Sequence, residues 1–496
     1  MMTATTLLHE LVSSAAADVP DRPAVIAPDG TVTTFAEFDR QIASVAAWLC
    51  ERTRLGDRVA VIADNGAEYA RLYYAVPRSG RLLVLINQRL SVPEQVAQLE
   101  ATGPALVVGD GRFLECLPAV APRIAFDSAE WLAAERYSPG TEVPSRPDDP
   151  AWLIFTSGST GIPKGVLHTH RSIIAAVAGT VAGRSVRSGG VYLLPFPMCH
   201  VAGYNVLVQH RTQSTVLPMP AFRADAFVEA VQAHGVTSCS LAPTMLHALL
   251  AHLDETGARL PSLRDVAYGS AAIPADLLRR ALSTLDVNFH QGYGMTETAG
   301  NVTFLGPAEH RAGADGDATA LASAGRPHDG VEVRIDGTDV GEILVRGAQV
   351  TVGLWPGGRP PTTDGWLRTG DVGRIDDEGR LVVLDRIKDV IITGGENVSS
   401  REVEDALSIH DAVEHVAVVG VPDDYWGEAI CAVVVARPGS DPAAEDLIAH
   451  VRARIAPFKR PRHVLFVDAL PTTSNGKIAK QAVREYARDL LRRSTG

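Results

Sequence analysis

The 496-residue chain carries 46 basic and 58 acidic residues, a formal net charge of −12, and 46% hydrophobic residues. A chain of this length exceeds what one hydrophobic core usually supports, so we expect two or more domains. The acidic balance argues against a general nucleic-acid-binding protein, although a local site can still bind an anion. Five cysteines, scattered and never in a CxxC pair, argue against a disulfide framework or a zinc site and predict a reducing, cytoplasmic location.

Two segments resemble targeting or membrane signals and are better explained otherwise. The first twenty residues lack the basic and continuous apolar regions of a secretory signal. Residues 188–210 are long and apolar enough to suggest a membrane span, but Pro195, Pro197, His200 and Asn205 interrupt them. We therefore predict a buried strand, a loop and a helix there, and no transmembrane segment.

The first part of the chain alternates helix and strand signals. A capping box at residues 34–37 begins an amphipathic helix that continues to residue 49. Residues 57–63 predict a buried strand, residues 67–76 a helix and residues 82–86 another strand. This alternation predicts an α/β domain with a largely parallel sheet. Residues 138–150 have a linker-like composition, but α/β signals continue on both sides, so we predict a surface loop within one domain.

The pattern changes after Gly330, where short β segments are separated by turn signals. Beyond Asp385 the sequence predicts a compact α+β unit of about a hundred residues, enough for a domain of its own. Its elements are a helix at 399–409, strands at 414–421 and 430–436, a helix at 444–455 and a strand at 463–468. We place the boundary near LDRIKDV, residues 384–390, with the large domain at 1–385 and the small domain at 389–496.

The stretch TSGSTGIPKGV, residues 156–166, has the composition of a phosphate-binding loop. It is not a Walker A loop, because no hydroxyl residue follows Lys164, and it lacks the GxSxG nucleophile elbow. Glycines allow a close backbone approach to an anion, hydroxyls donate hydrogen bonds, and the lysine supplies charge. A polar surface turn is the alternative, and the residues alone favour phosphate.

Six motifs occur in one order along the chain: TSGSTGIPKGV, GYGMTET at 292–298, GEILVRG at 341–347, GWLRTGDVG at 365–373, DRIKDVIITGGENVSSREVE at 385–404 and PTTSNGKIAK at 471–480. Together they resemble the adenylate-forming superfamily, which includes acyl-CoA synthetases, adenylation domains of peptide synthetases and firefly luciferase. The resemblance implies an α/β N-terminal domain with a small β-barrel-like part and a mobile α+β C-terminal domain. It also implies ATP, Mg²⁺ and coenzyme A, with acyl-AMP formed first and a thiol acylated second.

The resemblance assigns roles to individual residues. Lys477 corresponds to the catalytic lysine, with Lys480 as the plausible mistaken choice, and Thr296 and Glu297 to the α-phosphate and Mg²⁺ contacts. Tyr293 would pack on adenine, Asp371 would accept the ribose hydroxyls, and Arg386 would be a further nucleotide contact. The full ATP-binding set is Thr156, Ser157, Gly158, Ser159, Thr160, Gly161, Lys164, Ser270, Ala271, Gly292, Tyr293, Gly294, Thr296, Asp371, Arg386 and Lys477.

The remaining assignments concern the acid and the thiol. His200 would act at the mouth of an acyl pocket with Gly269 and Gly294. Gly394 and Gly395 would face the coenzyme A channel. Residues 386–388, with Lys388 at the family's hinge position, would form a hinge between the domains. Cys199 stands where relatives often have an aromatic residue, so pocket shapes cannot be borrowed from them.

Residues 192–222 contain no Asp or Glu to pair with a substrate ammonium. An unpaired ammonium in an apolar pocket is costly, so a fatty or aromatic acid is expected rather than an amino acid. Coenzyme A is the expected acceptor. Loading of a separate carrier protein is the enzymatic alternative, a non-catalytic nucleotide-binding regulator is another class, and luciferase-type oxidation is a third possibility. No nucleic-acid partner is expected.

Overall fold

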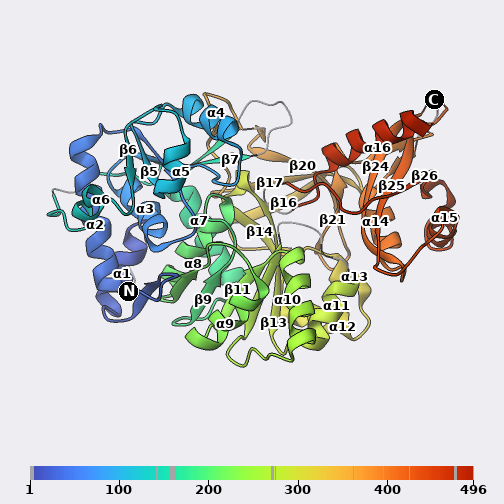
Figure 1. Ribbon diagram of the computed structural model, residues 1–496, viewed down its shortest axis with the longest axis horizontal. Helices are drawn as coiled ribbons and strands as arrows, with labels where there is room; N and C mark the ends of the chain where they lie inside the picture. Colours follow the sequence, from blue (N-terminus) through green and yellow to red (C-terminus); the bar gives the residue numbers. More distant parts are fainter. Residues whose placement is uncertain are drawn as a thin grey trace.

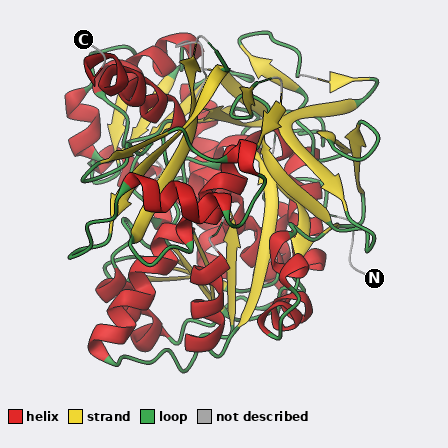
Figure 2. Cartoon of the chain, turned by 90° about the vertical axis from the view of Figure 1, so that its right-hand side faces the viewer, coloured by secondary structure: helices red, strands yellow, loops and turns green. Residues whose placement is uncertain are grey.

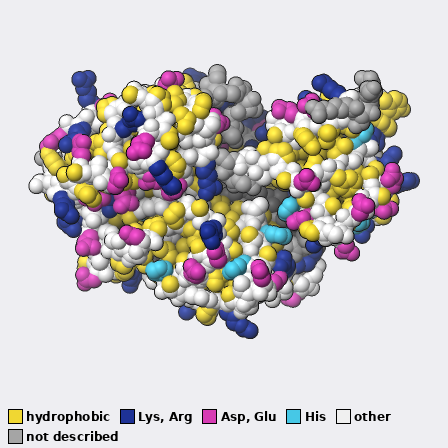
Figure 3. Space-filling view, viewed as in Figure 1, with side chains coloured by type: hydrophobic (Ala, Val, Ile, Leu, Met, Phe, Trp, Pro, Cys, Tyr) yellow, Lys and Arg dark blue, Asp and Glu magenta, His cyan; other side chains and the backbone are white. Residues whose placement is uncertain are grey.

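The structure is a computed structural model that describes residues 5–140, 143–156, 164–269, 273, 275–360, 362–394, 396–423, 425–473 and 477–494. Two lobes are visible in Figure 1, a large one built from most of the chain and a smaller one that carries the C-terminus. On the face drawn in Figure 3, acidic and basic side chains are interspersed over both lobes.

Two sheets form the frame of the large lobe. The first has nine strands in the described residues and is parallel at its centre, from β1 to β13, with antiparallel strands at its edges. Its order is β15 (Arg326–Pro327), β14 (Gly300–Leu305), β13 (Asn288–Met295), β12 (Asp265–Gly269), β11 (Ser238–Leu241), β9 (Val191–Leu194), β10 (Thr215–Pro218), β1 (Pro23–Ile26) and β2 (Val32–Thr34).

The second sheet has seven strands in the described residues. Like the first, it contains parallel pairs at its centre and antiparallel pairs at an edge. Its order is β18 (Gly353–Trp355), β8 (Lys164–Thr169), β7 (Pro150–Thr156), β4 (Leu82–Leu85), β3 (Arg58–Ile62), β5 (Leu106–Gly109) and β6 (Arg123–Ala125). The predicted linker at 138–150 leads directly into β7, which pairs with β4. This pairing supports a loop within one domain, which stays a prediction.

Helices cover the sheets, and in the turned view of Figure 2 they lie on either side of the long strands. Those of the large lobe are α1 (Glu10–Asp18), α2 (Phe35–Arg52), α3 (Ala67–Arg78), α4 (Val92–Thr102), α5 (Gly111–Cys116), α6 (Ala129–Ala134), α7 (His170–Gly183), α8 (Asn205–Arg211), α9 (Ala224–His234), α10 (Pro243–Thr256), α11 (Ala275–Thr284), α12 (Pro307–Ala314) and α13 (Ala318–Ala322), with short 3-10 turns η1 (Val201–Tyr204) and η2 (Thr296–Thr298). The capping box at Thr34 is present and starts α2 as expected.

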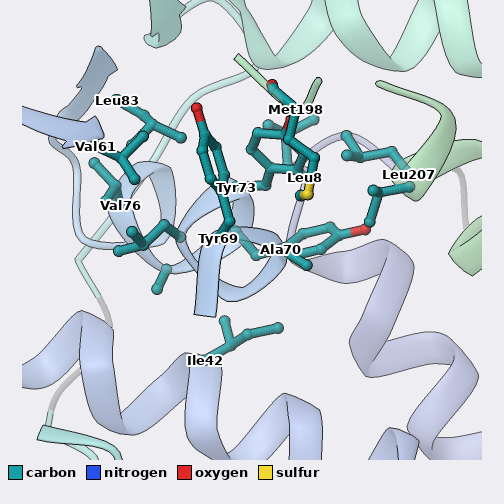
Figure 4. Packing of buried hydrophobic residues seen from close by; sticks show 14 of the residues in the cluster. Leu8, Ile42, Val61, Tyr69, Ala70, Tyr73, Val76, Leu83, Met198 and Leu207 are labelled. Carbon is teal, nitrogen blue, oxygen red and sulfur yellow. Dashed lines mark hydrogen bonds between the residues drawn. The ribbon is translucent and has the colours of Figure 1, made fainter. Parts of the chain in front are cut away.

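One apolar core joins the two sheets. Its buried residues come from strands of both sheets and from α1, α2, α3, α7 and α8. Figure 4 shows Tyr73 of α3 at its centre, with Val61 of β3 on one side and Met198, which follows β9, on the other. The Tyr73 hydroxyl donates to the Met198 carbonyl, and the Trp152 indole donates to the Tyr73 carbonyl at 3.1 Å. The two sheets are thus fixed to each other through α3.

A third, antiparallel sheet leads into the small lobe. It contains β16 (Val331–Asp336), β17 (Gly341–Gly347), β20 (Trp366–Ile375) and β19 (Thr362–Thr363), and β21 (Leu381–Arg386) pairs with β20. The small lobe holds β22 (Ile391–Thr393), β23 (Glu396–Val398), α14 (Ser400–Ser408), β24 (Val413–Asp423), β25 (Gly427–Ala436), α15 (Ala444–Arg452), η3 (Pro457–Lys459), β26 (His463–Phe466) and α16 (Lys480–Ser494).

The sequence predicted the elements of the small lobe from α14 to β26 and missed its last helix, α16. The segment 188–210 forms β9, a loop, η1 and the start of α8, as predicted. Among the described residues, no helix has the length and apolar character needed to cross a membrane. The exact domain bounds at 385 and 389 stay predictions, although β21 ends at Arg386 and β22 begins at Ile391.

Candidate active site

A buried carboxylate lies where the first and third sheets meet. Asp371 of β20 is 4% exposed. Its Oδ2 accepts a hydrogen bond from the Tyr293 hydroxyl of β13 at 2.7 Å, and its Oδ1 lies 2.8 Å from Nε of Arg386. Asp371 and Arg386 are register partners on β20 and β21, so the sheet itself brings the two together.

The electrostatics of this group favour a polar ligand. Burial raises the pKa of Asp371, and Arg386 opposes the rise. Burial and the nearby Asp371 raise the pKa of Tyr293, which keeps its hydroxyl protonated and able to donate. The group therefore combines acceptor oxygens, a donor hydroxyl and a half-exposed guanidinium, which suits a ligand with hydroxyls and negative charge.

Thr296 and Glu297 form the short turn η2 directly after β13. The buried ring of His168 contacts the Thr296 carbonyl at 2.7 Å, and the Thr351 amide donates to the Glu297 carbonyl at 2.7 Å. Burial raises the pKa of Glu297, with Arg386 as an opposing positive charge. A carboxylate that burial disfavours gains from a divalent cation, and Mg²⁺ prefers such oxygen ligands. Glu297 thus fits the predicted Mg²⁺ contact.

The glycines of this region are explained by close backbone packing. Gly269 and Gly292 face each other across β12 and β13, and a Cβ on Gly269 would lie 2.7 Å from the Gly292 carbonyl oxygen. A Cβ on Gly294 would lie 2.1 Å from the Gly300 carbonyl oxygen. Both contacts are with backbone, so larger residues would force the strands apart.

Lys477, which precedes α16, lies near the same site. Its amide donates to the Thr473 hydroxyl at 3.2 Å, and Thr472 and Ile478 form a β-bridge. The residue is exposed at the surface, yet the surrounding protein partly desolvates its ammonium. This desolvation and, to a smaller extent, the positive charge of Arg386 lower the pKa of Lys477, and the negative charge of Asp371 opposes them. Lys477 therefore lies within electrostatic reach of the buried carboxylate.

Lys480, the alternative lysine, is engaged elsewhere. Its ammonium lies 2.9 Å from Oε1 of the partly buried Glu404 and donates to the Ser400 hydroxyl. That hydroxyl in turn donates to Oδ2 of Asp385 at 2.8 Å. Lys480 thus ties the start of α16 to α14 and β21, which leaves Lys477 as the lysine near Asp371.

The structure describes the phosphate-loop stretch only at Thr156 and from Lys164 onward. Thr156 ends β7, Lys164 begins β8, and the two are register partners, with Lys164 exposed. β7 and β8 thus form an antiparallel pair of the seven-stranded sheet. Several predicted residues lie outside the described part of the chain: Ser157, Gly158, Ser159, Thr160, Gly161, Ser270, Ala271 and Gly395.

His200 lies on the loop after β9, at the start of η1, and its carbonyl accepts from the Gly203 amide at 2.9 Å. Cys199 beside it is buried, and burial raises the pKa of its thiol to about 12.

The sequence did not predict a role for Asn65, a 3% exposed residue between β3 and α3. Its Nδ2 donates to the carbonyls of residues 194, 196 and 219, and its Oδ1 accepts from the Met198 amide at 2.8 Å. Asn65 therefore fixes the His200 loop to the other sheet.

The predicted hinge residue Lys388 is exposed in the short turn between β21 and β22. A cavity of about 980 Å³ lies beside this turn, between β20, β21 and α14, with a largely aliphatic lining that includes Val382, Val390 and Ile455. Gly394, predicted at the coenzyme A channel, has a φ of +60°, and a Cβ there would lie 2.8 Å from the Trp426 ring. Lys388 thus lies two residues after Arg386 of the Asp371 group, and Gly394 follows β22 in the small lobe.

Comparison with known proteins gives a consistent family. Residues 12–355 match the AMP-binding enzyme family and residues 402–477 match the AMP-binding enzyme C-terminal domain. A feruloyl-CoA synthase from Amycolatopsis sp is 37% identical, with 92% of this chain and 94% of that protein covered. The fatty acid–[acyl-carrier-protein] ligase ScoC of Streptomyces coeruleorubidus is 33% identical, with 94% and 93% covered. The solved structure of the amide bond synthetase McbA from Marinactinospora thermotolerans has a TM-score of 0.87 at 32% identity, with 97% and 99% covered.

Proposed function

Because the chain belongs to the AMP-binding enzyme family and is an AMP-forming acid–thiol ligase, we propose that its substrate is an apolar aromatic or fatty acid and its acceptor coenzyme A. ATP and Mg²⁺ take part in the first step. The scattered cysteines, all present as thiols in the described residues, support the proposed cytoplasmic location.

The reaction has two steps. A carboxylate oxygen of the acid attacks the α-phosphorus of ATP, the bond from that phosphorus to the bridging oxygen breaks, and pyrophosphate leaves. The product is an acyl-adenylate. The thiolate of coenzyme A then attacks the acyl carbon and AMP leaves. Positioning and charge neutralisation carry a phosphoryl transfer of this kind, with little covalent help from the protein.

The convergence of Asp371, Tyr293, Arg386 and Lys477 from distant segments is the observation that supports these roles. In the proposal the Asp371 carboxylate accepts the ribose hydroxyls and Glu297 holds Mg²⁺. The Lys477 ammonium contacts both the attacking carboxylate of the substrate acid and the α-phosphate of ATP. It stabilises the negative charge that accumulates on these two groups during the reaction. Removal of such a contact usually slows a reaction by about 10²–10³-fold.

The choice of an apolar acid rests on the segment that bears His200. Residues 192–222 contain no carboxylate, and His200 and Cys199 stand in this segment between two sheets. The feruloyl-CoA synthase, a relative named for an aromatic acid, supports the aromatic class, while ScoC supports fatty acids and a carrier-protein acceptor. The similarity to an amide bond synthetase makes an amine a further acceptor to test.

An acid panel tests the proposal. Pyrophosphate release is measured with cinnamates, benzoates and fatty acids of several lengths, each with coenzyme A, a phosphopantetheinyl carrier protein or a simple amine. We expect adenylation of at least one apolar acid class and a coenzyme A-dependent thioester product. Equally negligible turnover of all apolar acids, or turnover of amino acids alone, would contradict the proposed substrate class.

A further inference from the structure

A second, smaller cavity lies at the opposite edge of the nine-stranded sheet from the nucleotide site. It measures about 210 Å³, and its lining includes Arg184, Gln209, Arg264, Asp265 and His290. Asp265 begins β12, whose far end is Gly269 in the candidate active site. Since parallel strands have their amino ends at one edge and their carboxyl ends at the other, this cavity is separate from the nucleotide site.

Three buried nitrogen atoms of the lining have no hydrogen-bond partner in the described structure. They are Nε of Arg184, Nε2 of Gln209 and Nδ1 of His290, and these residues are 6%, 2% and 6% exposed. Buried polar atoms are nearly always paired in folded proteins, by protein groups, water or a ligand. Three such atoms around one cavity indicate a polar occupant.

The charge of the lining indicates an anion. The buried guanidinium of Arg184 donates from Nη1 to Oδ1 of Asn205 at 3.2 Å, a neutral acceptor, and no ion pair is found for it among the described residues. Arg187 and Arg264 are exposed members of the same lining. Apart from the histidine, the three arginines and Asp265 of the lining leave a net of two positive charges. A charge buried without a partner is costly, so an anion beside Arg184 would offset that cost. A dianion would match the two net positive charges of the lining.

The histidine favours a phosphate group over other oxyanions. Nε2 of His290 lies 3.4 Å from Oδ1 of Asp265, which also accepts from Nδ2 of Asn288 at 3.2 Å. When the neutral ring donates from Nε2, Nδ1 is an acceptor, and when the ring is protonated, Nδ1 is a donor. Hydrogen phosphate has both a hydroxyl and anionic oxygens and satisfies either state, whereas sulfate has no hydroxyl.

We propose that this cavity binds a phosphate group, with Arg184 and Gln209 as buried donors, His290 as a further contact, and Arg187 and Arg264 attracting the anion at the surface. The ligand is inorganic phosphate or the phosphate of a small monoester; a doubly charged monoester has no hydroxyl and would accept from Nδ1 of a protonated His290. The cavity, at about 210 Å³, is large enough for a small anion, because a cavity of only about 10–15 Å³ already holds a water molecule.

The test is thermal unfolding of the full chain, saturated with AMP so that the nucleotide site is occupied. Inorganic phosphate, glycerol phosphate, sulfate and acetate are titrated at constant ionic strength set with sodium chloride. A ligand that binds only the native state raises the melting temperature saturably. We expect such a rise with phosphate and a smaller one with sulfate. A response to glycerol phosphate at lower concentration would identify a monoester as the ligand.

Variants locate the effect. The exposed pair Arg187→Ala/Arg264→Ala should fold normally and need at least about tenfold more phosphate, and Gln209→Leu should weaken the response without a change of charge. Lys477→Ala should respond as the natural chain does. A phosphate series that matches chloride, an unchanged response in the arginine pair variant, or loss of the response in Lys477→Ala would each overturn the proposal. None of these outcomes depends on which acid is activated.

Discussion

Asn65 offers a direct test of the proposal that the His200 loop, held between the two sheets, shapes the acid pocket. Asn65→Ala removes the acceptor of the Met198 amide and the donor that three carbonyls share. An unsatisfied buried group costs about 1–3 kcal/mol. With the Met198 amide left unpaired and the carbonyls short of one donor, we expect the free energy of unfolding to fall by about 3 kcal/mol. The loop that carries His200 would lose its anchor.

The functional consequence is separable from the loss of stability. Gln95 of α4 is a matched control, because it is 4% exposed and its Nε2 also donates to three carbonyls, at residues 87, 88 and 90. Urea unfolding should show similar losses for Asn65→Ala and Gln95→Ala. Pyrophosphate-release kinetics should show a raised KM for the acid in Asn65→Ala alone. Equal acid KM values in the two variants would refute the view that Asn65 positions the pocket.

Three further predictions concern the small lobe and pH. Lys477→Ala should slow acyl-adenylate formation by about 10²–10³-fold yet still convert supplied acyl-adenylate to thioester, and an equal loss in both half-reactions would contradict its proposed role. Gly394→Ala should impair thioester formation more than adenylation, because its Cβ would meet the Trp426 ring at 2.8 Å; Gly439→Ala, at a φ of +83° with nothing within 4 Å, controls for backbone strain alone. Burial lowers the pKa of His168 and His210 to about 4. The unfolded chain then binds more protons below pH 6.5, so stability should fall from pH 6.5 to 4 by up to about 3 kcal/mol per histidine. Urea unfolding checks the sign of this effect. The free energy of unfolding of His210→Phe should depend less on pH between 6.5 and 4 than that of the natural chain.

The sequence predicted the elements with strong local signals. The capping box at Thr34 and the alternating segments that follow it appear in the structure as expected, because local propensity and burial agree there. The family motifs also placed Asp371, Arg386 and Tyr293 together before any geometry was known. Their roles stay predictions.

Long-range pairing explains what the sequence did not show. The division of the large lobe into two sheets depends on which strands pair, and β7 returns to β4 from 65 residues later in the chain. Asn65 looks like a turn residue by sequence, since its partners are backbone groups more than a hundred positions away. Helix α16 is largely polar, so its apolar stripe of Val483 and Ala487 is a weak signal without the sheet it covers.

The contacts of Lys480 have a consequence for any shortened form of this protein. Asp385, Ser400 and Lys480 form a chain of polar contacts from β21 to the first turn of α16, only three residues after Lys477. Val483 and Ala487 hold the same helix on its sheet. A polypeptide truncated before α16 would retain Lys477 in its sequence but lose the contacts that hold the following helix against α14 and β21.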